Sequence, residues 1–215
     1  MPDKLQSFMD QYFNGIELVP ALFYAWEPGI RFEIADPKRS YEEPNFLAQA
    51  FERSKALFDA AFNEEDEILL VTDLITWRNN SFIRKKPLNV YQKYIKQPQA
   101  LYKLQLEDIQ LSEFDDNITT RRFSYACRKE DIRYPQLLQA ICYQDFDHPS
   151  TITSYQGSSA QIYLINITQQ LIYHLYDDRG CDIIAADKEN IRFLYEQYND
   201  WILDYDRDKI DAVFK

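Results

Sequence analysis

Apolar segments of strand length are clearest in the last third of the chain. Residues 161–166 and 171–176 are rich in Ile, Leu and Tyr and are separated only by residues 167–170. This pattern predicts two antiparallel strands joined by a short turn. Residues 181–185 are apolar and follow a second turn at residues 177–180, so they predict a third strand.

Four more segments have the features of strands. Residues 22–26 and 30–34 flank Glu27-Pro28-Gly29, a tight-turn signal, and therefore predict a hairpin. Residues 67–75 are dense in Ile, Leu and Val, which is typical of a strand buried on both faces. Residues 121–129 alternate between apolar and polar positions and predict another strand.

Apolar residues recur at helical spacing in five segments. The first is residues 1–13, and the second runs up to residue 62 behind a capping-box pattern at Ser40 and Glu43. The third is residues 90–104, with a break at Pro98, and the fourth is residues 135–146, with Pro135 in the first turn. The fifth is a final helix that Asp187 caps. Strands joined by hairpins and interspersed with such helices predict an α+β fold, in which amphipathic helices cover one face of an antiparallel or mixed sheet. No linker rich in Pro, Gly or Ser divides the chain, so residues 1–215 are predicted to form a single domain.

Charge narrows the class of partner. The chain has 35 acidic and 24 basic residues, and its net charge of −11 argues against binding to nucleic acid or to an anionic membrane surface. A basic protein such as a toxin domain is the partner that this charge favours, although the same charge also keeps a soluble protein dispersed. The sequence begins without a signal-peptide pattern and its three cysteines form no CxxC motif, so a cytoplasmic location is expected.

The familiar catalytic and nucleotide-binding motifs do not occur in the sequence. Only two histidines are present, so a histidine-rich metal site is nearly excluded and no cofactor is predicted. His148 lies beside Pro149 in a predicted loop and is expected at the surface. His174 shares a strand face with Ile172 and Tyr176, where it is either a hydrogen-bonded histidine of the sheet or a catalytic base.

The most unusual segment is the turn before the last predicted strand. Three carboxylates, those of Asp177, Asp178 and Asp182, bracket Arg179 and Gly180. Their oxygens could hold a divalent cation, or Arg179 could bind a carboxylate or phosphate of a partner. Alternatively the segment has only turn chemistry, with Gly180 in the left-handed conformation of a hairpin loop.

A second group of candidate residues lies on two other predicted strands. Arg31 and Glu33 are two residues apart and therefore face the same side of the sheet. Asp73 interrupts an apolar strand, where an unpaired carboxylate is costly unless it marks the exposed end of that strand. The three residues are interpreted as the polar group of a ligand pocket, with an ordinary surface pair of Arg31 and Glu33 as the alternative.

The predicted final helix carries acidic residues near its end. Asp200 and Asp204 are four residues apart and lie on its polar face. With Asp206 and Asp208 just beyond, and with Trp201 and Tyr205 as anchors, they form either a docking surface for a basic partner or the solvated end of a helix.

Several stretches of the chain resemble a known family. They are Leu22-Phe23-Tyr24-Ala25-Trp26 with Gly29-Ile30-Arg31-Phe32-Glu33, Tyr176-Asp177-Asp178-Arg179-Gly180-Cys181-Asp182, and Tyr198-Asn199-Asp200-Trp201-Ile202-Leu203. In these segments the chain resembles a bacterial, Bacillus-like family catalogued as domain of unknown function 3885, over about residues 8–207. The resemblance implies a bacterial origin and a single domain, and it implies no activity or catalytic residue.

Three hypotheses about function follow. The first is a non-enzymatic protein-binding or immunity-type protein with an acidic docking surface. Its acidic residues concentrate at residues 64–67, at residues 177–182 and at the end of the final helix; these segments form a docking surface if they share one face, and they only aid solubility if they scatter. The second is a metal-assisted hydrolase that uses the carboxylates of the turn at 177–182, and the third is a small-ligand sensor with a pocket near Arg31. The first is favoured, because the chain is strongly acidic and carries no catalytic motif.

Overall fold

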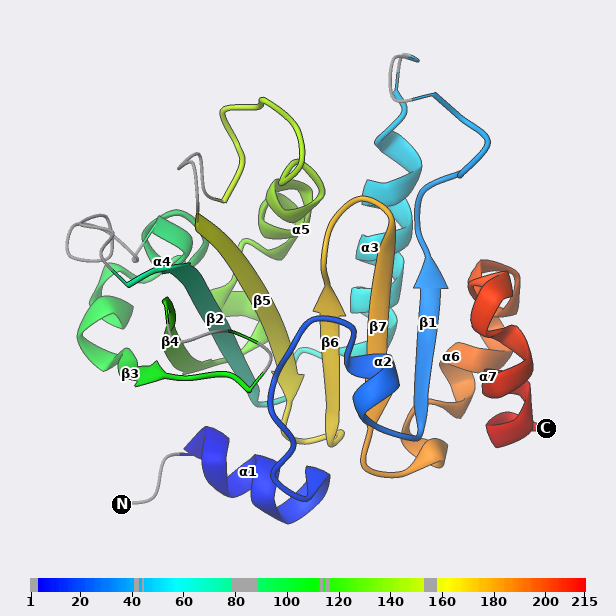
Figure 1. Cartoon of the computed structure of the whole chain (residues 1–215), viewed down its shortest axis with the longest axis horizontal. Helices are drawn as coiled ribbons and strands as arrows, with labels where there is room; N and C mark the ends of the chain where they lie inside the picture. Colours follow the sequence, from blue (N-terminus) through cyan, green and yellow to red (C-terminus); the bar gives the residue numbers. More distant parts are fainter. Residues whose placement is uncertain are drawn as a thin grey trace.

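The structure is a computed structural model that describes residues 4–40, 43, 45–78, 89–112, 114, 117–152 and 158–215. The basic run Arg84-Lys85-Lys86 and the acidic pair Asp115-Asp116 lie outside the described residues. Seven antiparallel strands form one sheet in the order β1-β7-β6-β5-β2-β4-β3 (Figure 1). Their bounds are β1 Gly29–Glu33, β2 Ile68–Trp77, β3 Gln105–Ile109, β4 Ile118–Cys127, β5 Ser158–Asn166, β6 Leu171–Leu175 and β7 Gly180–Ala185.

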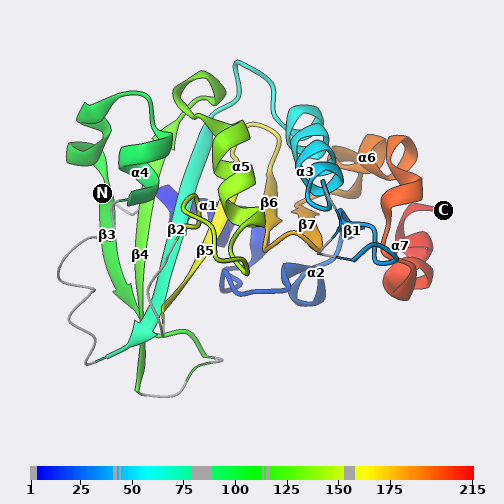
Figure 2. The same ribbon diagram turned by 90° about the horizontal axis from the view of Figure 1, so that it is seen from above.

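The main helical layer packs on one face of this sheet. The α-helices are α1 Lys4–Phe13, α2 Leu22–Ala25, α3 Ala48–Ala61, α4 Asn89–Tyr94, α5 Tyr134–Cys142, α6 Arg192–Gln197 and α7 Arg207–Phe214. The larger core lies under α3 and α5 and includes Phe32, Phe58 and Leu164. Figure 2 shows α3 and α2 on opposite sides of β7. No helix among the described residues combines the length and apolar character needed to cross a membrane.

The predicted fold class is confirmed, because an antiparallel sheet carries a layer of amphipathic helices. The structure adds a second, smaller core on the opposite face, where α1 and the segment that follows it pack. Phe8 and Phe13 of α1 contact this face together with Leu22, against Val71 of β2 and Ile172 of β6. Helices therefore pack on both faces of the sheet, and on the face that carries α1 they cover only part of it (Figure 1).

Residues 22–26, predicted as a strand, are instead the short helix α2 and the residue after it. The backbone N–H of Phe23 donates to the Asp182 carboxylate at 3.1 Å, and the indole N–H of Trp26 donates to the carbonyl of Ala185 at 2.7 Å. These bonds hold the segment on the face of β7, so β1 pairs with β7 and not with residues 22–26. A short apolar run fits a strand and a buried helical turn equally well.

The capping-box pattern forms its contact but does not begin a helix. The Glu43 carboxylate accepts a hydrogen bond from the backbone N–H of Ser40 at 3.0 Å, as the pattern predicts. However, α3 begins only at Ala48. Asn45 has a φ of 63°, a left-handed conformation that interrupts a right-handed helix.

The single final helix predicted from its apolar stripe is wrong. The chain forms α6, the 3-10 helices η5 Asn199–Trp201 and η6 Asp204–Asp206, and then α7. Between η5 and η6, Ile202 forms an antiparallel bridge with Phe32, and the N–H of Leu203 donates to the carbonyl of Arg31 at 3.0 Å. The helix is broken because this segment pairs with the outer edge of β1, whose backbone groups would otherwise face solvent.

Candidate functional site

A row of polar side chains crosses the sheet on the face that carries α1 and α2. Residues opposite one another in antiparallel strands share a face. Arg31 lies opposite Asp182, which lies opposite His174, and Asp73 lies opposite both Gln161 and Arg122. The "polar row" thus consists of Arg31, Asp182, His174, Gln161, Asp73 and Arg122, from five of the inner strands and the edge strand β1.

Arg31 and Asp182 form a buried ion pair at one end of the polar row. The Arg31 Nε and Nη2 atoms lie 2.8 and 2.9 Å from the two oxygens of Asp182, which is fully buried. The guanidinium lies over the ring of Tyr24 at 4.5 Å and is 3.8 Å from Asp206. Burial alone would lower the pKa of Arg31, but the hydrogen bonds to Asp182 outweigh it and raise that pKa. The sequence placed Arg31 and Asp182 in different sites, whereas the structure makes them partners.

Asp73 and Arg122 form a second pair in the middle of the sheet. Asp73 is fully buried, and its oxygens lie 2.7 and 2.5 Å from Arg122 Nε and Nη2. Burial raises the pKa of Asp73, and Arg122 opposes this shift. Asp73 is therefore not the exposed end of a strand. Because β7, β6 and β5 separate β1 from β2, Asp73 does not join Arg31 in one pocket.

His174 lies between these pairs and is fully buried. Its Nε2 is 3.0 Å from Oε1 of Gln161, and its ring stacks on that of Tyr163 at 4.4 Å between centroids. Burial and then the charge of Arg31 lower the pKa of His174 to about 3. The ring is therefore neutral near neutral pH and is enclosed by the sheet, as expected of a structural histidine.

The segment of η5 and η6 places a second set of predicted residues beside β1. The Arg53 guanidinium lies over the ring of Trp201 at 5.0 Å and donates to the carbonyl of Glu33 at 2.7 Å. Burial raises the pKa of Glu33, against the effect of Arg53 and with a contribution from Asp204. The sequence assigned Glu33 to one site and Trp201 and Asp204 to another, and the structure brings them together.

We define the "edge surface" as the residues Tyr24, Glu33, Trp201, Asp204 and Tyr205. The Asp204 side chain is 97% exposed, and Tyr205 is 86% exposed. Beneath them the buried Asp206 accepts a hydrogen bond from the Tyr24 hydroxyl at 3.0 Å. Sequence analysis did not select Tyr24, and it placed Asp206 only among the acids at the end of the final helix, because no pattern brings the two residues together.

The structure corrects the predicted geometry of Asp200 and Asp204. They do not share one helix, because Asp200 lies in η5 and Asp204 begins η6. Both are exposed, and Arg207 lies 3.4 Å from Asp204.

The carboxylates that gather at the acidic turn between β6 and β7 are not the three that were predicted. Asp182 points to Arg31 on the opposite face, while Asp145, which follows α5, joins Asp177 and Asp178. Carboxylate oxygens of these three residues lie within 4.8 Å of one another. Burial, followed by the charge of Asp177, raises the pKa of Asp178 to about 6. Asp145 could not be found from sequence, since only the fold brings it to the turn.

Turn chemistry accounts for part of this segment. The Asp177 carboxylate accepts hydrogen bonds from the backbone N–H and the Nε of Arg179, both at 2.7 Å. The prediction that Gly180 is left-handed is wrong, because its φ is not positive and it belongs to β7. A Cβ atom at this position would clash with the side chain of Tyr176, so the close approach of that ring explains the glycine.

The thiols are enclosed rather than reactive. Cys127, Cys142 and Cys181 are all buried and unpaired. Burial raises the pKa of Cys127 to about 12, and it raises those of Cys142 and Cys181 further. These cysteines therefore stay protonated and pack as small apolar residues near neutral pH.

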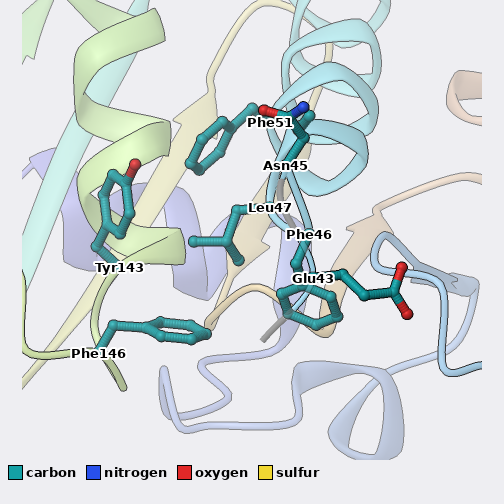
Figure 3. Close-up of a pocket in the computed structure, with 8 residues that line it drawn as sticks. Glu43, Asn45, Phe46, Leu47, Phe51, Tyr143 and Phe146 are labelled. Atoms are coloured by element: carbon teal, nitrogen blue, oxygen red, sulfur yellow. The ribbon is translucent and has the colours of Figure 1, made fainter. Parts of the chain in front are cut away.

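A hollow of about 420 Å³ lies between the approach to α3 and the end of α5. It is lined by Glu43, Asn45, Phe46, Leu47, Ala48, Phe51, Tyr143 and Phe146. Figure 3 shows Phe51, Leu47 and Phe146 directed into it, whereas the Glu43 carboxylate points away. No pattern in the sequence predicted this hollow.

The fold is that of an α+β protein with one antiparallel sheet. On the face that carries α1, the charged residues of the polar row are paired mainly with one another. The chain belongs to the bacterial family of the domain of unknown function (DUF3885), whose model matches residues 5–206. It is similar to the "Uncharacterized protein YnaE" of Bacillus subtilis (strain 168), with 29% identity over 211 residues that cover 94% of this chain and 98% of that protein. No solved structure matches the chain.

Proposed function

We propose that this protein is a non-enzymatic binding protein and that it docks a basic protein partner, such as a toxin domain, on the edge surface. The observation that carries the proposal is the 86% exposure of Tyr205 on a segment that is bonded to β1. Tyrosine, tryptophan and arginine supply most of the binding energy in protein interfaces, and they do so best when they are held rigidly.

A buried frame supports the exposed residues of the edge surface. Asp206 binds the Tyr24 hydroxyl and lies 3.8 Å from Arg31, which is itself fixed by Asp182. A partner would therefore meet a Tyr24 ring that is already ordered, so less conformational entropy would be lost on binding. Tyr24 is 53% exposed and offers a second aromatic contact beside Tyr205.

The charge of this surface favours a basic partner. Asp200, Asp204 and Asp208 are exposed around Tyr205. Acidic groups at the rim of an interface attract a basic partner and raise the association rate. The other two acidic segments are elsewhere: residues 64–67 precede β2 at one end of the sheet, and the turn at 177–178 is buried at the other end. Of these three acidic segments, only the end of the chain contributes to the proposed site.

Replacing Tyr205 with alanine is expected to weaken binding to the partner at least about tenfold, because a central aromatic anchor contributes 2 kcal/mol or more. The product of the neighbouring gene is the first partner to test, with the dissociation constant measured by calorimetry. Asp204→Asn should mainly lower the association rate at low salt.

Tyr102→Ala is the matched control, because Tyr102 is 93% exposed but lies in the 3-10 helix Pro98–Lys103, away from β1. This variant should bind like the wild type. Equal affinity of the wild type and Tyr205→Ala for a partner that binds the chain would contradict the edge surface as the docking site. Absence of binding to any neighbouring gene product, with no protection of cells from it, would contradict the immunity-type role.

A further inference from the structure

We propose that the hollow between the approach to α3 and the end of α5 binds a small quaternary-ammonium compound of the size of choline. Aromatic residues from both sides line it: Phe46 and Phe51 from the α3 side, and Tyr143 and Phe146 from the end of α5. All four residues are half-buried. The hollow is therefore walled by rings from two segments that are distant in the sequence.

The hollow has the size of a small-molecule site. Its volume of about 420 Å³ lies within the range of roughly 300–1,000 Å³ that is typical of ligand pockets. Figure 3 shows the four rings placed around the side chain of Leu47. A molecule seated on Leu47 would thus meet aromatic rings on several sides.

Contacts within the protein already hold two of these rings in place. Tyr143 stacks on His148 with 3.7 Å between the ring centroids, and Nδ1 of His148 accepts a hydrogen bond from the backbone N–H of Ser150 at 3.1 Å. The ring of Tyr143 also meets that of Phe51 at 5.3 Å, with an angle of 60° between their planes. Phe51 in turn packs against the larger core. A ligand would therefore lose little free energy in ordering this wall.

Charge favours a cation as the occupant. Of the described residues that line the hollow none is basic, whereas Glu43 is acidic. Asp145 and Asp147 lie on either side of the last lining residue in the chain, and both are exposed. Arg39 pairs with Glu43 and Arg179 pairs with Asp145, but the chain as a whole keeps a net charge of −11. This surrounding charge attracts a cation and repels an anion.

Aromatic walls select a quaternary ammonium group among cations. The negative face of an aromatic ring attracts a cation within about 6 Å of the ring centroid. A lysine ammonium or an arginine guanidinium carries N–H donors, and burying these among rings without acceptors is costly. A quaternary ammonium group has no N–H donor, and its methyl groups can pack against the rings. No residue of the edge surface lines the hollow, so this inference does not depend on the proposed protein partner.

The test is an NMR titration of the full chain with choline chloride and with the neutral alcohol in which a carbon atom replaces the charged nitrogen of choline. The two compounds have nearly the same shape, so the difference in their affinities measures the effect of the charge. Choline is expected to bind saturably, with its methyl resonance shifted upfield by the rings. It should bind at least about fivefold more tightly than the neutral alcohol.

A pair of matched variants locates the site. Phe146→Leu keeps an apolar side chain but removes one ring, so it should weaken choline binding several-fold. Phe193→Leu makes the same change at a phenylalanine of α6 that is 39% exposed and does not line the hollow, and it should bind choline like the wild type. The Tm of each variant checks that it folds, and the comparison of choline with the alcohol uses the wild type alone.

Three results would overturn the proposal. Equal affinities for choline and the neutral alcohol would show an apolar hollow that does not select a cation. Equal choline affinities of the wild type and a folded Phe146→Leu variant would place the binding elsewhere. Absence of saturable choline binding to the wild type would remove the site altogether.

Discussion

Replacing Arg31 with methionine is expected to lower the free energy of unfolding by about 3–5 kcal/mol, because the substitution leaves the buried Asp182 carboxylate without its ion-pair partner. Asp182 is fully buried, and after the change the hydrogen bond from the backbone N–H of Phe23 is the one that its carboxylate keeps from the described residues. The variant also loses the contact of the guanidinium with the Tyr24 ring. Equilibrium unfolding in urea, followed by circular dichroism, measures the loss.

Two comparisons separate the buried charge from general damage. The double variant Arg31→Met, Asp182→Leu should recover most of the lost stability, since an apolar pair can replace a buried ion pair at little cost. Arg121→Met removes an arginine whose partner, Asp108, is 61% exposed, and it should cost no more than about 1 kcal/mol. An Arg31→Met variant no less stable than Arg121→Met would show that the pair is not critical.

Lowering the pH from 7 to 4 is expected to cost the wild type about 3 kcal/mol through His174 alone. Burial and the charge of Arg31 lower the pKa of this histidine from 6.5 to about 3. Between these values the unfolded chain binds a proton that the folded chain does not bind. The unfolded state is therefore favoured as the pH falls through this window, and the stability contributed by neutral His174 is fully present only above pH 6.5.

Unfolding of His174→Phe at both pH values tests this expectation. Phenylalanine retains a ring that can stack on Tyr163 and has no titrating group, so its loss of stability between pH 7 and 4 should be smaller by about 3 kcal/mol. Gln161 loses its partner in the variant but is partly exposed and can bind water. His148→Phe, which replaces the other histidine, is the control. The same loss on acidification in the wild type and in His174→Phe would refute the role of His174.

These two predictions describe one property of the polar row. Its charges are matched across adjacent strands, so they stabilise the arrangement of the sheet and are largely unavailable to a ligand. The chemistry that remains open to solvent includes the edge surface beyond β1. Binding experiments therefore address the edge surface, and stability experiments address the polar row.

The sequence alone identified most strands and the fold class. The dense Ile, Leu and Val run predicted β2, which is central and buried almost throughout. Two apolar segments on either side of a short turn predicted β5 and β6, and the break at Pro98 separated α4 from the following 3-10 helix. These elements are determined by local periodicity and by the backbone restriction of proline, which act within a few residues.

Other features depended on contacts between distant segments. The strand β3 had no sequence signal, since four of its five residues are exposed. Residues 22–26 became a helix because Asp182 binds the N–H of Phe23, a contact across 159 residues. The final helix was broken because Ile202 pairs with Phe32, although its apolar stripe favoured a continuous helix.

The same contrast between local signals and long-range contacts applies to the candidate site residues. Sequence reasoning selected Asp73 because a charge in an apolar strand is unusual, Arg31 because it shares a strand face with Glu33, and Asp182 as part of the acidic turn. All three are buried. It could not pair them, because alternation gives the face on which a residue lies but not the neighbouring strand. The order β1-β7-β6-β5-β2-β4-β3 decides that Arg31 meets Asp182 and Asp73 meets Arg122. The sequence determined which charges enter the sheet, and only the tertiary structure decided their partners, because ion pairs act over a few ångströms between segments that the chain itself keeps far apart.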